Sequence, residues 1–407
     1  MADALAKGAG AALVSRVPEG CADAPLLVVP EVQAALEALG RAGRARSRAR
    51  VVAVTGSVGK TSTKEMLRDV LAPQGRVHAA VKSFNNHWGV PLTLAAIPGD
   101  ADFVVVEIGM NHPGEIAPLA LQARPHVALV TTVAPVHLEA FPDGVDGIAR
   151  EKAAIFDGLE PGGAAIWNAD VETAPILAER GTVSFGTGAA DWQMTEVVAA
   201  RDGTACRART PLGELDFRIG SPGAHFALNA LCVLAAVHAL GADVARAALA
   251  LSEWTPPDGR GRRASVTLDR EAPPLDLIDD AYNANPASVG AALDLLAGAA
   301  VPGRARRIAI LGDMKELGPT GPALHAALAD HPAMSGIDAV HTVGPLMRSL
   351  GDALPRDRRG RHAETAEALV PALSELVAPG DAVLVKGSLS MRMAVLVEGI
   401  RALGREG

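Results

Sequence analysis

A short glycine-containing loop behind an apolar run constrains the fold of this chain more than any other feature. Residues 51–54 are uninterrupted hydrophobic sequence, and Thr55-Gly56-Ser57-Val58-Gly59-Lys60-Thr61 follows directly. A buried strand that feeds such a loop and then a helix aims backbone N–H groups and the positive helix end at one point. Lys60 adds a mobile cation, and Thr61 adds a hydroxyl suited to Mg²⁺. The sequence therefore predicts a phosphate-binding strand–loop–helix unit.

The loop differs from the commonest nucleotide-binding spacing, G-x-x-x-x-G-K-[ST], because Val54 stands five residues before Gly59. Its form is the shorter T-G-x-x-G-K-T. A glycine-lysine turn can also be a structural connection only. The predicted strand and helix on its two sides favour phosphate binding.

The segment after the loop has the periodicity of an amphipathic helix. Its apolar side chains recur at three- and four-residue spacing: Met66, Leu67, Val70 and Leu71. The charged side chains fall on the opposite face: Lys64, Glu65, Arg68 and Asp69. We therefore expect a helix with a buried apolar face and a solvated charged face.

The composition indicates a globular, soluble protein of two or three domains. The chain has 407 residues, of which 49% are hydrophobic and 21% charged, so it can bury substantial cores. Its 38 basic and 46 acidic residues give a net charge of −8, and no broad attraction to nucleic acid is expected. Three cysteines, an odd number without metal-ligand spacing, favour a reducing compartment. We expect a cytoplasmic protein.

No segment is expected to cross a membrane or to direct secretion. The longest apolar stretch, residues 226–240, contains Asn229 and His238. It is shorter than the ~20 residues needed to span a bilayer, so we expect a buried helix there. The N-terminal sequence lacks the positively charged start, apolar middle and small-residue cleavage site of a signal peptide. It therefore predicts no secretory signal.

Two series of strand-like runs alternate with helix-compatible segments, which predicts an α/β fold with mostly parallel sheets. The first series is 51–54, 103–108, 127–130 and 164–167, and the second is 275–278, 307–311, 339–343 and 382–385. The Pro- and Gly-containing stretch 255–261 separates the two series. We expect a central domain of P-loop type over 48–262 and a Rossmann-like α/β domain over 263–407, with a cleft at the hinge.

Residues 1–47 are too few to form a stable independent domain. They hold short apolar runs at 11–14 and 26–29 and a helical pattern near 32–42. Chains below ~40 to 60 residues bury only a small share of their surface. We interpret this segment as part of a larger α/β domain.

Polar residues follow the predicted strands of the first series, at the edge where parallel sheets bind ligands. Glu107 lies in the run 103–108 and is placed to hold Mg²⁺ against ATP. His137 follows the run 127–130 by a short loop, and it is either a metal ligand or proton carrier or a loop residue that only hydrogen-bonds. From periodicity alone we interpret Lys152 as a solvated charge of a helix.

Three polar loops follow strands of the second series: residues 279–286, 312–318 and 386–388. The first contains Tyr282, the only tyrosine of the chain, and ends in Asn-Pro, which often merely initiates a turn. Because all three loops follow strands of one expected parallel sheet, they predict a pocket at its carboxyl edge.

Seven motifs taken together resemble the Mur ligase family. They are T-G-S-V-G-K-T (55–61), N-N-H-W-G-V-P-L-T-L (85–94), V-E-I-G-M-N-H-P-G-E-I (106–116), H-L-E (137–139), D-D-A-Y-N-A-N-P (279–286), G-D-M-K-E-L-G (312–318) and V-K-G-S (385–388). Their order and spacing are far more specific than the phosphate loop alone. Within the family, the sequence is most similar to the ligases that act on UDP-N-acetylmuramoyl-tripeptide and D-alanyl-D-alanine.

The resemblance implies an ATP-dependent ligase of peptidoglycan precursor synthesis, with ATP and Mg²⁺ as cofactors. In this family the γ-phosphoryl group of ATP moves to a substrate carboxylate, and the amine of D-alanyl-D-alanine then displaces phosphate from the acyl phosphate. Such a site must align the reactants and neutralise charge on phosphoryl oxygens. The resemblance implies no nucleic-acid or membrane partner, and a monomer.

By position in the motifs, the resemblance also implies the roles of individual residues. The expected nucleotide contacts are Thr55, Gly56, Ser57, Val58, Gly59, Lys60, Thr61, Asn229, Arg260, Asp280 and Asn283. The expected substrate-side residues are Asn85, Asn86, Asn111, His112, Asn285 and Lys386. The expected metal ligands are Thr61, Glu107, His137 and Lys152, and the expected catalytic residues are Lys60, His137 and Lys152. Lys152 matches a lysine that family members carbamylate, which requires a neutral amine and reverses its interpretation as a solvated charge.

The chain also departs from the family pattern. The UDP-binding domain of the family is normally longer than residues 1–47, and its Asp/Ser-Arg uridine signature is missing before Ala2. Thr132 stands where many relatives have Asn, and Leu389 where many have Arg. We therefore expect a truncated UDP-binding domain beside complete ATP machinery. Two alternatives stay open: another Mur-type or folylpolyglutamate-type ligase, and an ATP-binding protein that ligates nothing.

Overall fold

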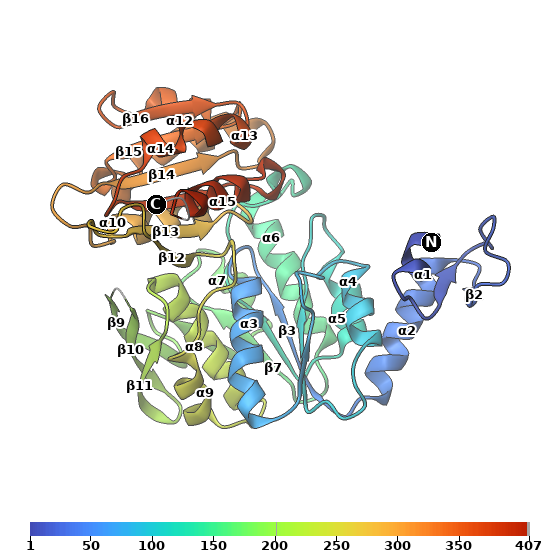
Figure 1. Cartoon of the computed structure of the whole chain (residues 1–407). Coiled ribbons are helices and arrows are strands. Elements are labelled where there is room, and N and C mark those ends of the chain that lie inside the picture. The colour runs from blue at the N-terminus through green and yellow to red at the C-terminus, as the bar shows by residue number, and fades with distance from the viewer. Residues whose placement is uncertain (201, 405–407) are drawn as a thin grey trace.

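Two sheets and a small N-terminal unit make up the structure, a computed structural model that describes residues 1–200 and 202–404 (Figure 1). In spatial order, the larger sheet contains β11 (Gly213–Ile219), β10 (Gly203–Thr210), β9 (Trp192–Ala200), β8 (Val183–Gly186), β7 (Ala164–Asn168), β6 (Val127–Val130), β3 (Arg50–Thr55), β5 (Phe103–Glu107) and β4 (Val77–Ala79). The smaller sheet contains β12 (Arg262–Val266), β13 (Leu275–Asp280), β17 (Ala382–Lys386), β14 (Arg307–Gly312), β15 (Ala339–Val343) and β16 (Arg359–Ala363). We call residues 48–261 the central region and 262–404 the C-terminal region; the expected boundary at 262/263 falls one residue inside β12.

The predicted parallel sheets are confirmed for most of both regions. Strands β3 to β8 pair in parallel around β3, and β13 to β17 pair in parallel around β17 and β14. Each predicted run coincides with an observed strand to within two residues at either end. These strands are buried on both faces, which is why they read as continuous apolar sequence.

The sequence interpretation missed the antiparallel end of the larger sheet. Strands β9, β10 and β11 pair antiparallel with one another, whereas the strand rhythm predicted only parallel connections. In β10, buried and exposed residues alternate from Thr204 to Thr210. Only one face of this hairpin array is covered, so its sequence lacks the continuous apolar runs of the central strands.

Helices cover both faces of each sheet. In the central region, α3 (Lys60–Leu71), α8 (Ala224–Ala239) and α9 (Val244–Leu251) pack on one face, and α4 (Gly89–Ala95), α5 (Ile116–Ala123), α6 (Gly144–Ala153) and α7 (Ala174–Ala178) pack on the other. In the C-terminal region the helices are α10 (Pro286–Ala297), α11 (Gly321–Ala326), α12 (Arg348–Ala353), α13 (Ala366–Leu369), α14 (Leu373–Leu376) and α15 (Ala394–Leu403). The predicted buried helix at 226–240 is confirmed as α8. None of the described helices is long and apolar enough to cross a bilayer.

The charged face predicted for α3 is wrong at two positions. The four apolar residues of the helix are buried as expected, but Lys64 is fully buried and Glu65 nearly so. Residues 80–82 cover this side of the helix, and Lys64 Nζ donates to the Ala80 carbonyl at 2.7 Å and pairs with Glu65 at 2.6 Å. These partners compensate the loss of hydration that normally keeps lysine at a surface.

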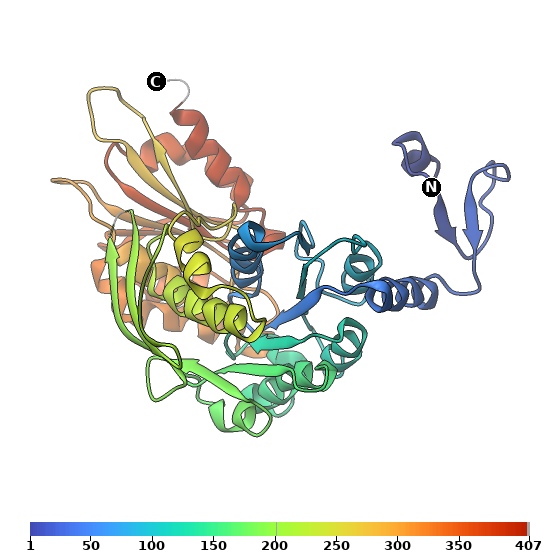
Figure 2. The ribbon, with the colours of Figure 1, turned by 90° about the horizontal axis from the view of Figure 1, so that it is seen from below.

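The N-terminal unit projects from the body and joins it through α2 (Val32–Arg46) (Figure 2). It holds α1 (Ala2–Ala6) and a parallel pair of strands, β1 (Ala12–Val14) and β2 (Leu26–Val28). None of residues 1–39 is buried. At its other end α2 crosses α4, where a Cβ atom added to Gly43 would lie only 2.2 Å from the Leu94 carbonyl oxygen. Close backbone packing against α4 and hydrogen bonds from Arg44 to the Ala123 and Arg124 carbonyls therefore attach α2 to the body.

We predict that Gly43→Ala lowers the melting temperature, although alanine favours an isolated helix over glycine by about 1 kcal/mol. The added methyl group meets the backbone of α4, and overpacking of this kind costs about 1–3 kcal/mol. Thermal unfolding followed by circular dichroism measures the effect. Gly99→Ala is the control, because nothing lies within 4 Å of its added Cβ. Equal melting temperatures for the two variants would contradict the role of Gly43.

Candidate functional site

The loop between β3 and α3 is packed so closely that two of its positions exclude side chains. Gly56 and Gly59 have positive φ angles of 149° and 86°. A Cβ atom on Gly56 would lie 1.9 Å from Thr131 Oγ1, and one on Gly59 would lie 3.0 Å from the Asn229 amide. The loop is thus held between the segment after β6 and helix α8, and Asn229 lies beside it as the motif comparison expected.

Hydrogen bonds from the same segment fix the loop backbone. Thr131 Oγ1 donates to the Val58 carbonyl at 2.6 Å, and the Ser57 N–H donates to the Thr132 carbonyl at 2.8 Å. The Ser57 hydroxyl also accepts from the Ala134 N–H at 2.9 Å. The loop therefore needs little reorganisation to bind an anion.

Lys60 places a cation at the centre of this loop. Its Nζ donates to the Gly56 carbonyl at 2.6 Å. Burial lowers the pKa of Lys60, the negative charge of Glu107 opposes that shift, and the positive charge of Arg260 adds to it. An ammonium in this position faces any phosphate that the loop N–H groups bind.

Two of the four residues expected to hold Mg²⁺, Thr61 and Glu107, lie together at the end of β5. Glu107 is 1% exposed; it accepts from Thr61 Oγ1 at 3.0 Å and from Asn85 Nδ2 at 2.7 Å. No ion pair within the described ranges, 1–200 and 202–404, involves Glu107. A buried carboxylate beside a hydroxyl is the hard oxygen donor set that Mg²⁺ takes together with phosphate oxygens. The same ranges contain no group of three or more His, Cys, Asp and Glu residues that would hold a metal.

His137 and Lys152 add two more basic groups beside Lys60. Lys152, on α6, is 2% exposed, so its interpretation as a solvated charge is wrong. Burial lowers its pKa well below the usual value; the charge of Lys60 lowers it further, while Glu151 opposes the shift. The pKa of His137 is lowered by burial, opposed by Glu316, and lowered again by Lys60 and Lys152. The surroundings thus favour neutral forms of both side chains.

The three polar loops of the C-terminal region meet at the carboxyl edge of the smaller sheet. Lys386 Nζ donates to Asp280 Oδ2 at 2.7 Å and to the Asn283 carbonyl at 2.9 Å. The Ser388 N–H donates to the Asp313 carbonyl at 3.1 Å. Strands β13, β17 and β14 are adjacent, so the loops after them lie side by side.

Arg260 of the linker connects the two carboxyl edges. Its guanidinium lies 4.1 Å from the centre of the Tyr282 ring, and its Nη2 donates to Ser83 Oγ at 3.4 Å. Ser83 Oγ in turn lies 3.0 Å from Thr61 Oγ1. Tyr282 belongs to the C-terminal region and Ser83 to the central region. Arg260 therefore spans the interface next to the proposed metal ligands.

Several predicted substrate-side residues have structural contacts. The Asn86 side chain accepts from the N–H groups of Trp88 and Gly89 at the start of α4, and Asn285 caps α10. Asn111 and His112 lie in an exposed loop, held by Glu115. A substrate role for these four stays a prediction.

Sequence reasoning missed Ser83, Thr131 and Glu316, which contact the residues of the site. Glu316 stood inside a quoted motif, and Thr131 directly follows a predicted strand. Nothing in the local sequence marked Ser83.

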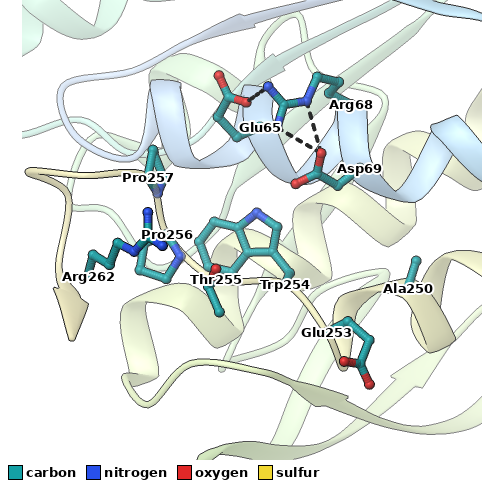
Figure 3. A pocket seen from close by; sticks show the side chains of 10 residues that line it. All are labelled: Glu65, Arg68, Asp69, Ala250, Glu253, Trp254, Thr255, Pro256, Pro257 and Arg262. Carbon is teal, nitrogen blue, oxygen red and sulfur yellow. Dashed lines mark hydrogen bonds and ion pairs between the residues drawn. The ribbon is translucent and has the colours of Figure 1, made fainter. Parts of the chain in front are cut away.

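A cavity of 570 Å³ lies against the linker, away from the loops described above (Figure 3). It is lined by Glu65, Arg68 and Asp69 of α3, by Trp254 and Thr255–Pro257, and by Arg262 of β12, among others. Arg68 pairs with both Glu65 and Asp69. Arg262 belongs to the C-terminal region, and the other lining residues belong to the central region.

Known proteins match nearly the whole chain. Residues 54–237 match the Mur ligase middle domain, and 262–389 match the Mur ligase, glutamate ligase domain. The UDP-N-acetylmuramoyl-tripeptide–D-alanyl-D-alanine ligase of Escherichia coli (strain K12) is 37% identical over 414 residues, covering 99% of this chain and 87% of the relative. The ligase of the same name from Bacillus subtilis (strain 168) is 32% identical over 97% of this chain and 85% of its own. A crystal structure of MurF from Acinetobacter baumannii covers 98% of this chain and 87% of its own, with a TM-score of 0.85 and 29% identity.

We predict that Lys386→Met destabilises the fold at neutral pH and less so in acid. Burial raises the pKa of Asp280, and Lys386 opposes that shift. Without Lys386 the carboxylate is unpaired, and breaking a buried pair costs about 3–5 kcal/mol; because Asp280 is 18% exposed, we expect the lower end. A raised folded-state pKa makes the charged form costly above that pKa, and protonation relieves the cost as pH falls.

Urea unfolding at pH 7.5 and pH 5 tests this pH dependence. The deficit of Lys386→Met should shrink at the lower pH, and adding Asp280→Asn should recover stability at pH 7.5. An equal deficit at both pH values would show that packing rather than charge is lost.

Proposed function

The chain belongs to the Mur ligase family, and from this premise we propose that it joins D-alanyl-D-alanine to UDP-N-acetylmuramoyl-tripeptide in an ATP-dependent step of peptidoglycan precursor synthesis. The similarity to ligases of that name over 97–99% of the chain supports the substrate pair. One structural observation carries the mechanism: the phosphate loop of the larger sheet faces the three polar loops of the smaller sheet across the interface that Arg260 spans. Two reactants can be aligned where these two sets of loops meet.

ATP binds, in this proposal, with its phosphates on the loop from Thr55 to Thr61. The fixed N–H groups and the start of α3 attract the phosphate oxygens, and Lys60 neutralises charge as it develops. Asn229 lies beside Gly59, and Arg260 approaches from the linker. These positions support the proposal that both side chains contact the nucleotide. A single preorganised donor of this kind contributes about 3 kcal/mol to the barrier.

Thr61 and Glu107 would hold one Mg²⁺, and His137 with carbamylated Lys152 would hold a second. When bound, Mg²⁺ neutralises negative charge on the phosphoryl oxygens. Carbamylation forms a bond from the neutral Lys152 nitrogen to the carbon of CO₂ and releases a proton. The burial of Lys152 and the lowered pKa of its amine support this step.

The chemistry then needs two displacements. A carboxylate oxygen of the tripeptide bonds to the γ-phosphorus while the bond to ADP breaks. The amine of D-alanyl-D-alanine attacks the acyl carbon, loses a proton, and phosphate leaves. Asn85 belongs to the central region, and Asp280, Asn283 and Lys386 belong to the C-terminal region. We assign these two sets to the tripeptide and to the nucleotide ribose or incoming dipeptide.

We divide the chain functionally as its sequence suggested. Residues 1–47 belong to the UDP-substrate side, 48–262 to the ATP-binding domain and 263–407 to the C-terminal ligase domain. Cys21, Cys206 and Cys232 are free cysteines, which agrees with a reducing cytoplasm.

We predict that phosphate release from ATP requires both UDP-N-acetylmuramoyl-tripeptide and D-alanyl-D-alanine. Glutamate or diaminopimelate in place of the dipeptide should give none, which separates this function from that of other Mur-type or folylpolyglutamate-type ligases. Lys60→Ala should lower kcat by ~10²–10³-fold with the fold intact, because one charge-stabilising donor is lost. Arg209→Ala is the control, because Arg209 is an exposed cation on β10 to which no role is assigned. Nucleotide-dependent stabilisation without substrate-stimulated phosphate release would instead indicate a binding protein.

We predict that Lys152→Ala abolishes most activity and that small carboxylates such as acetate restore part of it. The added anion would occupy the place of the carbamate. Steady-state rates with and without acetate measure the rescue, and Lys60→Ala should not respond. A Lys152→Ala enzyme with the rate of the native protein would remove the carbamate from the mechanism.

A further inference from the structure

A hydrogen bond between a histidine and a carboxylate joins the central and C-terminal regions at the site itself. His137 Nδ1 lies 2.7 Å from Glu316 Oε2. His137 stands in the segment after β6, and Glu316 stands in the loop after β14. Glu316 has no part in the proposed contacts to ATP, metal or substrate, although its carboxylate contacts His137, which is proposed to hold a metal.

The backbone at both positions is built for this contact. His137 and Glu316 have positive φ angles of 54° and 64°, and they are two of only four non-glycine residues with positive φ in the described part of the chain. Such conformations cost of order 1 kcal/mol or more and persist where the surroundings impose them. The two unusual conformations present the imidazole and the carboxylate to each other.

Contacts on either side of the pair hold the two loops in place. A Cβ atom on Gly318 would lie 3.3 Å from Glu139 Cβ, so the loop after β14 approaches the segment after β6 closely there. On the C-terminal side, the Lys315 N–H donates to Ser388 Oγ at 2.9 Å, and its Nζ pairs with the fully buried Asp313. The backbone of Glu316 is therefore anchored even though its side chain is 55% exposed.

The bond to Glu316 decides which nitrogen of the ring carries the proton. A carboxylate accepts, so Nδ1 must be the protonated atom, and Nε2 keeps its lone pair on the opposite side of the ring. Lys60 and Lys152 are the cationic groups that act electrostatically on this ring. A histidine that binds a metal through one nitrogen usually donates the other N–H to a carboxylate, which fixes the tautomer and the ring orientation.

We propose that Glu316 is a positioning residue: docking of the C-terminal region fixes the Nδ1–H tautomer of His137 and frees Nε2 for a ligand of the central region. The identity of that ligand as a divalent cation rests on the proposed function. The tautomer of His137 follows from the contact with Glu316 and does not rest on the proposed function. The site at His137 is then complete only when the two regions are in contact, so cation affinity there depends on domain docking.

The test compares Glu316→Gly and Glu316→Gln in the full chain. Glycine adopts a φ of 64° without strain, so the loop keeps its conformation when the side chain is removed. Glutamine keeps a hydrogen-bond acceptor without the charge. Glu364→Ala is the matched control, because Glu364 also contacts a histidine, His362, on the surface of the same region.

Long-range ¹H–¹⁵N spectra of ¹⁵N-histidine-labelled protein, assigned with a His137→Gln variant, report the tautomer. We expect the Nδ1–H form of His137 in the native chain and in Glu364→Ala, a mixture in Glu316→Gly, and partial retention in Glu316→Gln. A Glu316→Gly protein that keeps the native tautomer would overturn the proposal.

Mn²⁺ binding, followed by electron paramagnetic resonance with a non-hydrolysable ATP analogue, gives the second readout. We expect Glu316→Gly to weaken Mn²⁺ binding by about 10- to 100-fold, as for other residues behind a metal ligand. Unchanged Mn²⁺ affinity with a changed tautomer would overturn the coupling to the cation. If the native protein ligates nothing but its His137 tautomer responds to Glu316→Gly, the proposed function fails while the positioning role stands.

Discussion

The site depends on the close approach between the loop after β3 and the segment after β6. Because these strands are neighbours in the sheet, Thr131 lies directly against Gly56, and its hydroxyl bonds to the Val58 carbonyl. No side chain fits at Gly56, and the Ser57 N–H is fixed by its bond to the Thr132 carbonyl. The remaining residues of the site are arranged around this fixed point: Lys60 folds over it, and Asn229 closes it from α8.

The basic groups around this loop are poorly compensated within the central region. Burial lowers the pKa of both Lys60 and Lys152. The charge of Lys60 lowers the pKa of Lys152 further, and the charge of Arg260 lowers that of Lys60. Glu107 opposes the shift of Lys60, and Glu316 of the C-terminal region opposes the shift of His137. Carboxylates of both regions therefore act on this one cluster of basic groups. An anionic ligand bound beside Lys60 would share the positive charge with these carboxylates, so ligand and carboxylate would each reduce the attraction that the other feels.

The sequence predicted those parts of the fold in which burial requires apolar residues at every position. Parallel strands such as β3 and β6 are apolar throughout, so their positions could be read directly. Lys152 was misinterpreted from periodicity because residue type was given more weight than position: it lies four residues after Ile148 and three before Ile155, on the buried face. Asn86 and Asn285 show a second limit, since an asparagine that caps a helix and one that binds a ligand look the same in a motif. The pairing of His137 with Glu316 joins loops of different sheets, and no local pattern encodes it.

The linker is best understood as part of the C-terminal region. Gly259 and Gly261 have positive φ, the Gly261 N–H donates to the Asp279 carbonyl at 2.8 Å, and the Tyr282 N–H donates to the Gly259 carbonyl at 3.1 Å. These bonds tie Arg260 to the loop after β13, so its guanidinium moves with that loop while reaching Ser83. The polar contacts of Arg260 and Glu316 thus lie at the site, whereas the cavity beside Trp254 lies behind the linker. Through Arg260, the linker therefore contacts the loops of both regions at the site.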